Sequence, residues 1–311
     1  MTLQVEAGDG GLRLDRFLAL RWPDAVTRGQ IQRWIEGGHV RIGGQVSRSS
    51  LKVQPGMLVE VTPPPPLSSE AKPDPSITFP VLFEDDWLLV LNKPAGLVVH
   101  PARGHEEGTL VNGLLAHHGF EIEGEEGEAW ARPGIVHRLD KGTSGVMVVA
   151  RKDQAREGLK TLFECHNIER AYLAITVGTP RPGRIETLHG RHPTDRLRFT
   201  TRVRSGKRAV TDVEVLKELG ACALVRCRLS TGRTHQIRVH LTEVAGTPLL
   251  GDPVYGKLPR EPRLRALADD LGRQALHAAV LGFVHPITGE RLRFETPLPD
   301  DMARVLAALG G

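Results

Sequence analysis

The sequence predicts an α+β protein with a small N-terminal αβ module and a larger second domain. Its 311 residues are long enough for two domains, and an apolar content of 40% supports a substantial core. Four consecutive prolines at 63–66 open a segment, 63–76, that has few apolar residues and is typical of an extended linker. On both sides of this segment, β-branched apolar runs alternate with stretches of helical periodicity.

Residues 12–62 are predicted to form the N-terminal module. Three apolar residues are spaced for one face of a first helix: Leu14, Phe17 and Leu18. Thr27 can cap a second helix, whose apolar stripe is made by Ile31, Trp34 and Ile35. After Gly37-Gly38, which ends this helix, short strand-like segments follow at 39–42, 45–46 and 57–61.

The second domain is predicted to span 77–311. Its expected strands lie at 87–91, 146–150, 169–177, about 208–216 and 222–230. Helical periodicity covers 109–117 and 153–165, and Thr234 can cap a further helix that turns Ile237 and Leu241 to the core. An acidic, Gly-rich stretch at 121–128 is predicted to be a mobile surface loop.

Charge is mildly positive overall and strongly positive in one segment. The formal net charge is +4 and the sequence pI is about 9.1, which favours a polyanionic partner. Residues 181–208 hold nine Arg or Lys residues against Glu186 and Asp195. A run of this kind is usually a solvated face, but its one-sidedness in a nearly balanced chain indicates phosphate contacts.

The three cysteines predict neither a disulfide framework nor a zinc site. Cys165, Cys222 and Cys227 form no C-x-x-C pair, so we expect reduced, mostly buried thiols. The N-terminus lacks the charged-then-apolar pattern of a signal peptide, and no apolar run reaches about 18 residues. These features predict a soluble protein of the cytoplasm.

The stretch 134–150 carries the densest set of reactive side chains. Asp140 lies beside Arg138 and Lys141, just before the apolar strand 146–150, and glycines mark a tight loop between them. A carboxylate displayed among cations on such a loop can stay ionised and act as a nucleophile or base. The alternative is a purely structural connection in which Asp140 caps the loop or pairs with Arg138.

The string His-Arg-Leu-Asp-x-x-Thr-Ser-Gly at 137–145 resembles the signature of the RluA-type pseudouridine synthases. Further blocks resemble the same family, in the same order: N-K-P-x-G-x-x-x-H-P at 92–101, R-A-Y-L-A at 170–174 and T-G-R-T-H-Q-I-R-V-H-L at 231–241. Segments 251–256, 273–278 and 283–286 also fit and are expected to shape the scaffold. The module at 12–62 resembles an S4 RNA-binding module, so the likeness covers about 12–310.

The resemblance implies a large mixed, mainly antiparallel sheet with flanking helices, and a reaction without a cofactor. Asp140 would be the nucleophile or base. Tyr172 would stack on the uracil ring and help to remove the C5 proton, and Arg233 would be the buried partner of Asp140. Arg138 would fill the space left by the flipped-out target nucleotide. Further RNA contacts are predicted at Arg28, Arg33, Arg191 and Arg238.

The expected function is isomerisation of uridine to pseudouridine in RNA, with 23S rRNA as the substrate and a monomer as the default state. A tRNA uridine is the alternative substrate, and a non-catalytic RNA-binding or ribosome-assembly protein is the alternative class. A metal-dependent nuclease would need a cluster of carboxylates, whereas the central loop offers one. His235 and His240 are five residues apart, unlike the i, i+4 pair of a helical zinc site, so no metal is expected.

Overall fold

The structure, a computed structural model, describes residues 1–22, 28–63, 72–100, 107–118, 134–256 and 259–310, except for the side chains at 28–30 and 33. The predicted cap Thr27, the acidic stretch 121–128 and most of the linker 63–76 lie outside the described residues. The chain divides into two compact units, Met1–Ser69 and Glu70–Gly311.

The N-terminal unit packs two helices on a four-stranded sheet. Helices α1 (Leu14–Arg21) and α2 (Arg28–Glu36) lie at the positions that the apolar spacing predicts, with Phe17, Ile31 and Ile35 fully buried between them and the sheet. The strands are β1 (Thr2–Gln4), β2 (Val40–Ile42), β3 (Gln45–Val46) and β4 (Leu58–Val61), in the order β1-β4-β2-β3. A short 3-10 turn, Ala7–Asp9, follows β1. The unit therefore includes residues before 12, where the predicted module starts.

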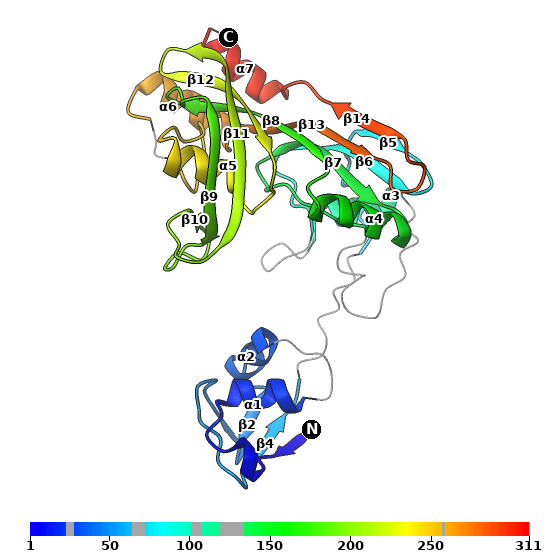
Figure 1. Cartoon of the computed structure of the whole chain (residues 1–311), viewed down its shortest axis with the longest axis vertical. Coiled ribbons are helices and arrows are strands. Elements are labelled where there is room, and N and C mark those ends of the chain that lie inside the picture. The colour runs from blue at the N-terminus through cyan, green and yellow to red at the C-terminus, as the bar shows by residue number, and fades with distance from the viewer. Residues whose placement is uncertain (23–27, 64–71, 101–106, 119–133, 257–258, 311) are drawn as a thin grey trace. The chain divides into compact units, whose positions relative to one another are not determined.

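A ten-stranded mixed sheet forms the second unit (Figure 1). Its path runs β10-β9-β11-β12-β8-β13-β7-β6-β5, and β14 pairs with β13. All neighbours are antiparallel except β7 and β13, which are parallel, so the predicted mixed, mainly antiparallel sheet is confirmed. The strands are β5 (Val81–Glu84), β6 (Leu88–Lys93), β7 (Ser144–Ala150), β8 (Glu169–Val177), β9 (Gly183–Arg191), β10 (Phe199–Thr200), β11 (Lys207–Leu219), β12 (Cys222–Leu229), β13 (Leu276–Val284) and β14 (Arg291–Glu295).

The helices of this unit flank the sheet. They are α3 (Leu110–His117), α4 (Asp153–Glu164), α5 (Gln236–Val239), α6 (Pro262–Leu271) and α7 (Asp300–Ala308), and a π-helical turn, His240–Val244, continues α5. The prediction that Thr234 caps a helix is wrong. The residue before α5 is His235, which has a left-handed backbone (φ 59°) and makes no side-chain cap bond.

Strand β7 lies between β6 and β13 and is buried at every residue. Because side chains alternate along a strand, its residues divide between two apolar clusters. Val148 and Ala150 pack with Leu159 of α4, whereas Met147 and Val149 pack with α3. The strand is therefore covered on both faces, which fixes the loop that precedes it.

Two predictions about the chain as a whole can be compared with the described residues. All three cysteines are free, Cys222 and Cys227 being buried and Cys165 exposed. Within the described ranges, no helix has both the length and the apolar character that a membrane crossing requires.

Candidate active site

The loop that carries Asp140 ends where β7 passes close to β13. Gly145 has φ +124°, and a Cβ atom at this position would lie 2.2 Å from the carbonyl oxygen of Ala278. Only glycine fits such an approach, which lets Ser144 and Gly145 pair in parallel with His277 and Ala278. Two residues before Gly145, the amide of Thr143 donates to the carbonyl oxygen of Asp140 at 2.9 Å. The local sequence therefore fixes the backbone on which Asp140 is displayed.

Three long side chains, those of Lys93, Arg273 and Gln274, form hydrogen bonds that hold this loop. Lys93 Nζ is fully buried and donates to the carbonyl oxygens of Pro94, Leu97 and Lys141. Burial and the nearby Arg273 lower the pKa of Lys93 to about 7. Block 92–101 therefore supports the loop through a direct bond from Lys93 to the residue after Asp140.

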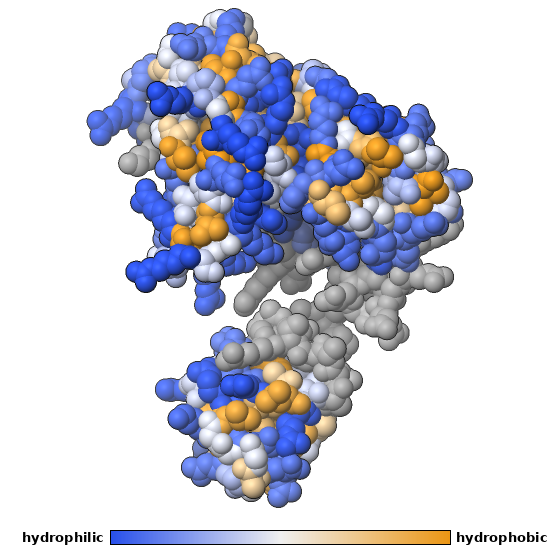
Figure 2. All heavy atoms as spheres, in the orientation of Figure 1, coloured by the Kyte–Doolittle hydropathy of each residue, from blue (hydrophilic) through white to orange (hydrophobic). Residues whose placement is uncertain are grey.

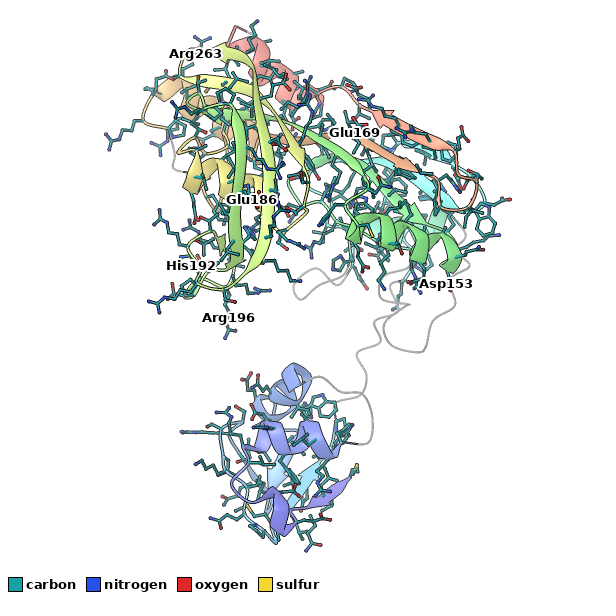
Figure 3. All side chains as sticks on the ribbon, in the orientation of Figure 1. Asp153, Glu169, Glu186, His192, Arg196 and Arg263 are labelled. Atoms are coloured by element: carbon teal, nitrogen blue, oxygen red, sulfur yellow. The ribbon has the colours of Figure 1, made fainter. Side chains whose placement is uncertain are left out.

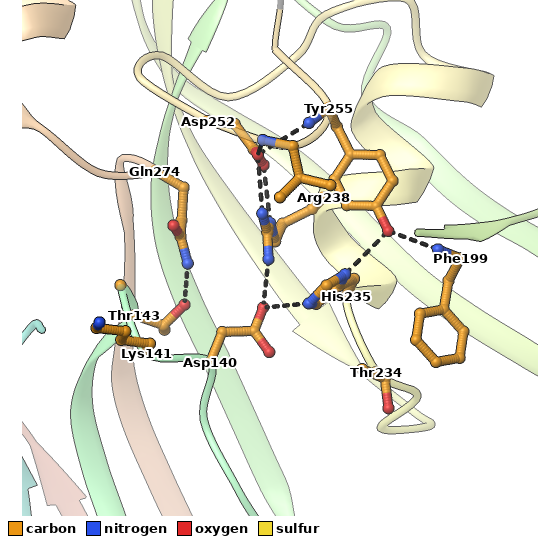
Figure 4. A network of polar contacts seen from close by, with 12 residues as sticks. Asp140, Lys141, Thr143, Phe199, Thr234, His235, Arg238, Asp252, Tyr255 and Gln274 are labelled. Atoms are coloured by element: carbon orange, nitrogen blue, oxygen red, sulfur yellow. Dashed lines mark hydrogen bonds and ion pairs between the residues drawn. The ribbon is translucent and has the colours of Figure 1, made fainter. Parts of the chain in front are cut away.

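The other two supports come from block 273–278. Arg273 donates to the carbonyl oxygen of Gly142 at 2.9 Å and is itself held by both carboxylate oxygens of Asp301. Gln274 Nε2 donates to Thr143 Oγ1 at 3.1 Å (Figure 4). The loop is thus bound at 141, 142 and 143, so the position of Asp140 does not depend on its own side-chain contacts alone.

The carboxylate of Asp140 is paired with Arg238 of helix α5. Arg238 Nη1 lies 2.9 Å from Asp140 Oδ2, while Nε and Nη2 of the same guanidinium each lie 2.8 Å from the carboxylate of Asp252. The side chains of Arg238 and Asp252 are 5% and 0% exposed, against 18% for Asp140. One buried cation therefore joins a buried carboxylate to a carboxylate that still reaches solvent (Figure 4).

The contacts within this triad keep Arg238 and Asp252 ionised. Burial on its own would lower the pKa of Arg238, but the hydrogen bonds and charges of Asp252 and Asp140 raise it instead. Burial would likewise raise the pKa of Asp252, yet Arg238 outweighs that effect and the pKa is lowered. A guanidinium with two carboxylates is stable in a low-dielectric site only as a paired assembly.

The predicted role of Arg233 as the buried partner of Asp140 is wrong. Arg233 is half-buried, and its Nε donates to the carbonyl oxygen of Arg208 at 3.1 Å. The left-handed backbone of His235 and the single helical turn after it turn Arg238, three residues after His235, toward Asp140. Arg238, predicted as an RNA contact, is instead the inner partner of this carboxylate.

A pocket beside Asp140 brings the other predicted residues together. Arg138, Tyr172 and Arg233 line it with Asp140, together with His235 and Arg238. Tyr172 lies on β8 between β12 and β13, where burial raises the pKa of its phenol. Arg138 is exposed at the pocket. The pocket therefore presents a carboxylate, a phenol and exposed cations to one small space.

Three residues that the sequence analysis did not assign to the site also reach it. Asp252 holds Arg238, and Tyr255 Oη lies 2.9 Å from His235 Nδ1, although block 251–256 was expected to shape only the scaffold. His235 Nε2 lies 3.7 Å from Asp140 Oδ2.

As the spacing predicts, His240 points elsewhere and contacts Thr187 and Thr211. Among the described residues, no group of three or more His, Cys, Asp or Glu side chains is arranged to hold a metal.

The basic segment forms a hairpin next to this site. Strands β9 and β10, residues 183–200, make the basic hairpin, and Figure 3 places His192 and Arg196 where the chain turns. Hydrophilic residues project around it (Figure 2). Arg191 is exposed and lies over the ring of Phe199, with 5.3 Å between its guanidinium carbon and the ring centroid.

In the N-terminal unit, Arg28 and Arg33 belong to α2, but their side chains are outside the described part.

Comparison with known proteins shows which protein families this chain resembles. The model of the family described as RNA pseudouridylate synthase matches residues 87–243, and that of the S4 domain matches residues 12–59. The uncharacterized RNA pseudouridine synthase YlyB of Bacillus subtilis is 45% identical over 299 residues, which cover 96% of this chain and 94% of that protein.

Among relatives with a named substrate, the ribosomal large subunit pseudouridine synthase D of Neisseria meningitidis is 43% identical over 314 residues, covering 99% of this chain and 81% of its own. Its name agrees with the expectation from the ordered sequence blocks, which resemble the large subunit pseudouridine synthase D or its C relative. A solved structure, the human RNA pseudouridylate synthase domain containing 4, superposes with a TM-score of 0.57 at 27% identity and covers 74% of this chain and 93% of its own. The fold, the ordered blocks and these relatives agree: the chain belongs to the RNA pseudouridine synthase family.

Proposed function

We propose that this RNA pseudouridine synthase isomerises uridines of 23S rRNA in the large ribosomal subunit, with Asp140 as its catalytic carboxylate and without a cofactor. The observation that carries the proposal is the Asp140–Arg238–Asp252 triad at a pocket shared with Tyr172. Near-full-length relatives named ribosomal large subunit pseudouridine synthase D support the substrate class.

The reaction requires a reacting group and a means of holding the detached base. The N1–C1′ bond must break, the uracil must rotate, C5 must bond to C1′, and the C5 proton must leave while N1 gains one. Arg238 and His235 both contact Oδ2 of Asp140, so Oδ1 is the oxygen that faces substrate. From there Asp140 can attack the base or the sugar, or remove a sugar proton.

In this proposal, Tyr172 contacts the uracil base and Arg138 fills the space that the nucleotide leaves in the RNA. The ring of Tyr172 can stack on uracil, and its phenol can approach the C5 proton. A uridine in folded RNA must leave its stack to reach the pocket, and the exposed Arg138 can occupy the vacated space. Arg233, at the same pocket but free of Asp140, is proposed as a contact to the RNA backbone.

The remaining basic residues are assigned to RNA binding. Residues 12–62 act as an S4 module with Arg28 and Arg33 on its second helix, 63–76 is a linker, and 77–311 is the catalytic domain. Arg191 on the basic hairpin would contact phosphates. The protein is proposed to act as a monomer in the cytoplasm, where ribosomes are assembled.

The test maps pseudouridine in cells that lack this protein. Carbodiimide treatment followed by primer extension on 23S rRNA should show stops that vanish in the deletion strain. They should return with the wild-type gene and not with Asp140→Ala. Unchanged stops in 23S rRNA would contradict the substrate, and the same mapping on tRNA would then test the alternative. Stops restored by Asp140→Ala would contradict the assigned carboxylate.

A further inference from the structure

His235 lies between the carboxylate of Asp140 and the phenol of Tyr255 (Figure 4). Its Nε2 is 3.7 Å from Asp140 Oδ2, and its Nδ1 is 2.9 Å from Tyr255 Oη. The phenol oxygen also accepts a hydrogen bond from the backbone amide of Phe199 at 2.8 Å. A chain of contacts therefore runs from Phe199 of strand β10, through Tyr255 and His235, to the carboxylate of Asp140.

The hydrogen atoms along this chain can be assigned. The Phe199 amide only donates, so Tyr255 Oη accepts there, and the phenol keeps its own hydrogen because burial raises its pKa to about 12. Among the contacts that the structure describes for Tyr255 Oη, Nδ1 of His235 is the one that can accept this hydrogen, and burial lowers the pKa of His235, which favours the neutral ring. A neutral imidazole with an accepting Nδ1 carries its proton on Nε2, the atom that faces Asp140.

The charges around His235 fit this tautomer. The facing groups are Asp140 and Asp252, which favour a donor on the ring, and Arg238 and Arg138, which oppose a second proton. The ring of Tyr255 is held in place, because the guanidinium carbons of Arg238 and Arg198 lie 5.1 and 5.2 Å from its centroid. At 3.7 Å the Nε2–H contact is longer than a hydrogen bond and is an electrostatic contact between the N–H and the carboxylate.

We propose that His235 and Tyr255 are positioning residues for Asp140: the Tyr255 hydroxyl fixes the imidazole tautomer that presents an N–H to Oδ2. With Arg238 on the same oxygen, the N–H stops the carboxylate from rotating and keeps Oδ1 directed to the substrate. His235 adopts a left-handed backbone (φ 59°), and this geometry is what brings its ring between the two groups. The inference rests on the proposed role of Asp140.

The experiment measures turnover as tritium released from C5 of labelled uridine in a 23S rRNA transcript, using the full-length protein. Tyr255→Phe removes only the hydroxyl and should lower kcat about tenfold with little change in KM, since the catalytic assembly then has one hydrogen bond fewer. His235→Leu should lower kcat at least as much. His235→Gln should stay within about threefold of wild type, because an amide N–H can take the place of Nε2–H.

The decisive comparison is Tyr255→Phe made in the His235→Gln background. A glutamine amide has no tautomer to fix, so the second substitution should have no further effect on kcat. An equal loss in both backgrounds would mean that the hydroxyl has a merely structural role and would overturn the proposal. His235→Leu controls for the strained backbone, since leucine must adopt the same φ as glutamine.

Asp140→Asn separates this proposal from the proposed function. Complete loss of tritium release in Asp140→Asn together with an unaffected Tyr255→Phe would overturn only the positioning role. Full activity of Asp140→Asn, or no release by the wild-type protein from this transcript, would overturn the proposed function and the positioning role with it.

Discussion

Two neighbouring regions of the second unit use arginine in opposite ways. In the Asp140 site, Arg238 is 5% exposed and bound to two carboxylates. In the basic hairpin, Arg191 and Arg196 are exposed, and the cations of segment 181–208 outnumber its acidic residues. A buried paired arginine fixes geometry, whereas an exposed one offers charge to a mobile polyanion. In the proposed function, the same side chain therefore serves chemistry in one region and RNA binding in the other.

The comparison predicts its largest effect at Arg238. Arg238→Met leaves Asp252 buried without its cation, which should cost about 3–5 kcal/mol of the free energy of unfolding and abolish turnover. Arg233→Met, in the same block, should change the free energy of unfolding by no more than about 0.5 kcal/mol. Urea unfolding followed by circular dichroism measures both.

A second variant separates stability from chemistry at this site. Arg238→Met combined with Asp252→Leu removes both buried charges, so much of the stability should return. Turnover should remain absent, because Asp140 still lacks its partner. Recovery of turnover in the double variant would show that the ion pair serves only the fold.

The buried His240, which lies outside the Asp140 site, should respond to protons. Burial lowers the pKa of His240 from 6.5 to about 4, while Thr187 and Thr211 contact both ring nitrogens. Its contribution to stability is therefore fully present above pH 6.5 and falls as the pH drops toward 4. The loss reaches at most about 1.4 kcal/mol per pH unit, since one proton is involved.

His240→Gln removes this titration. Urea unfolding between pH 4.5 and 7.5 should show a shallower pH dependence in the variant than in the wild type. The groups that face His240, namely His189 and Glu243, are unchanged in both proteins. Parallel curves for the two proteins would contradict the assignment of a buried neutral imidazole.

The basic hairpin should respond to salt. Arg191→Gln with Arg196→Gln should weaken binding of a 23S rRNA transcript. The slope of log affinity against log salt should fall by about 0.7–0.9 for each phosphate that the protein no longer neutralises. The free energy of unfolding should change by only about 0.5 kcal/mol, because both side chains are at the surface.

The matched control for the hairpin is Arg265→Gln, an exposed arginine on helix α6. It removes one positive charge, as each hairpin substitution does, from another element and should leave the salt slope unchanged. If Arg265→Gln lowered the slope as much as a hairpin substitution, net charge alone would explain binding and the contrast between the regions would lose its basis.

Much of this architecture follows from sequence pattern. Strand β8 spans the predicted 169–177, and β7 and α4 lie where apolar periodicity places them. Asp140 and Tyr172 come to one pocket although they belong to different elements. Pattern succeeds here because burial is periodic: a strand covered on both faces leaves a continuous apolar run, and a helix with one buried face leaves a stripe.

Pattern failed where the backbone departs from a regular period. Both Arg233 and Arg238 are in the recognised block, but their directions depend on the left-handed conformation of His235 and on a one-turn helix. The resemblance implied Arg233, and only the local backbone shows that Arg238 is the arginine of this block that turns to Asp140. Asp252 and Tyr255 were missed for another reason, because only the tertiary fold brings block 251–256 to the site.

The most direct test of the account is single-turnover tritium release by purified Asp140→Asn on a 23S rRNA transcript, with binding measured in parallel. Asparagine has nearly the same size and keeps an oxygen for Arg238, so the fold and RNA affinity should be retained. The account predicts transcript binding like that of the wild type and no detectable release of tritium from C5. Release within tenfold of the wild-type rate would contradict the claim that the Asp140 carboxylate carries the reaction.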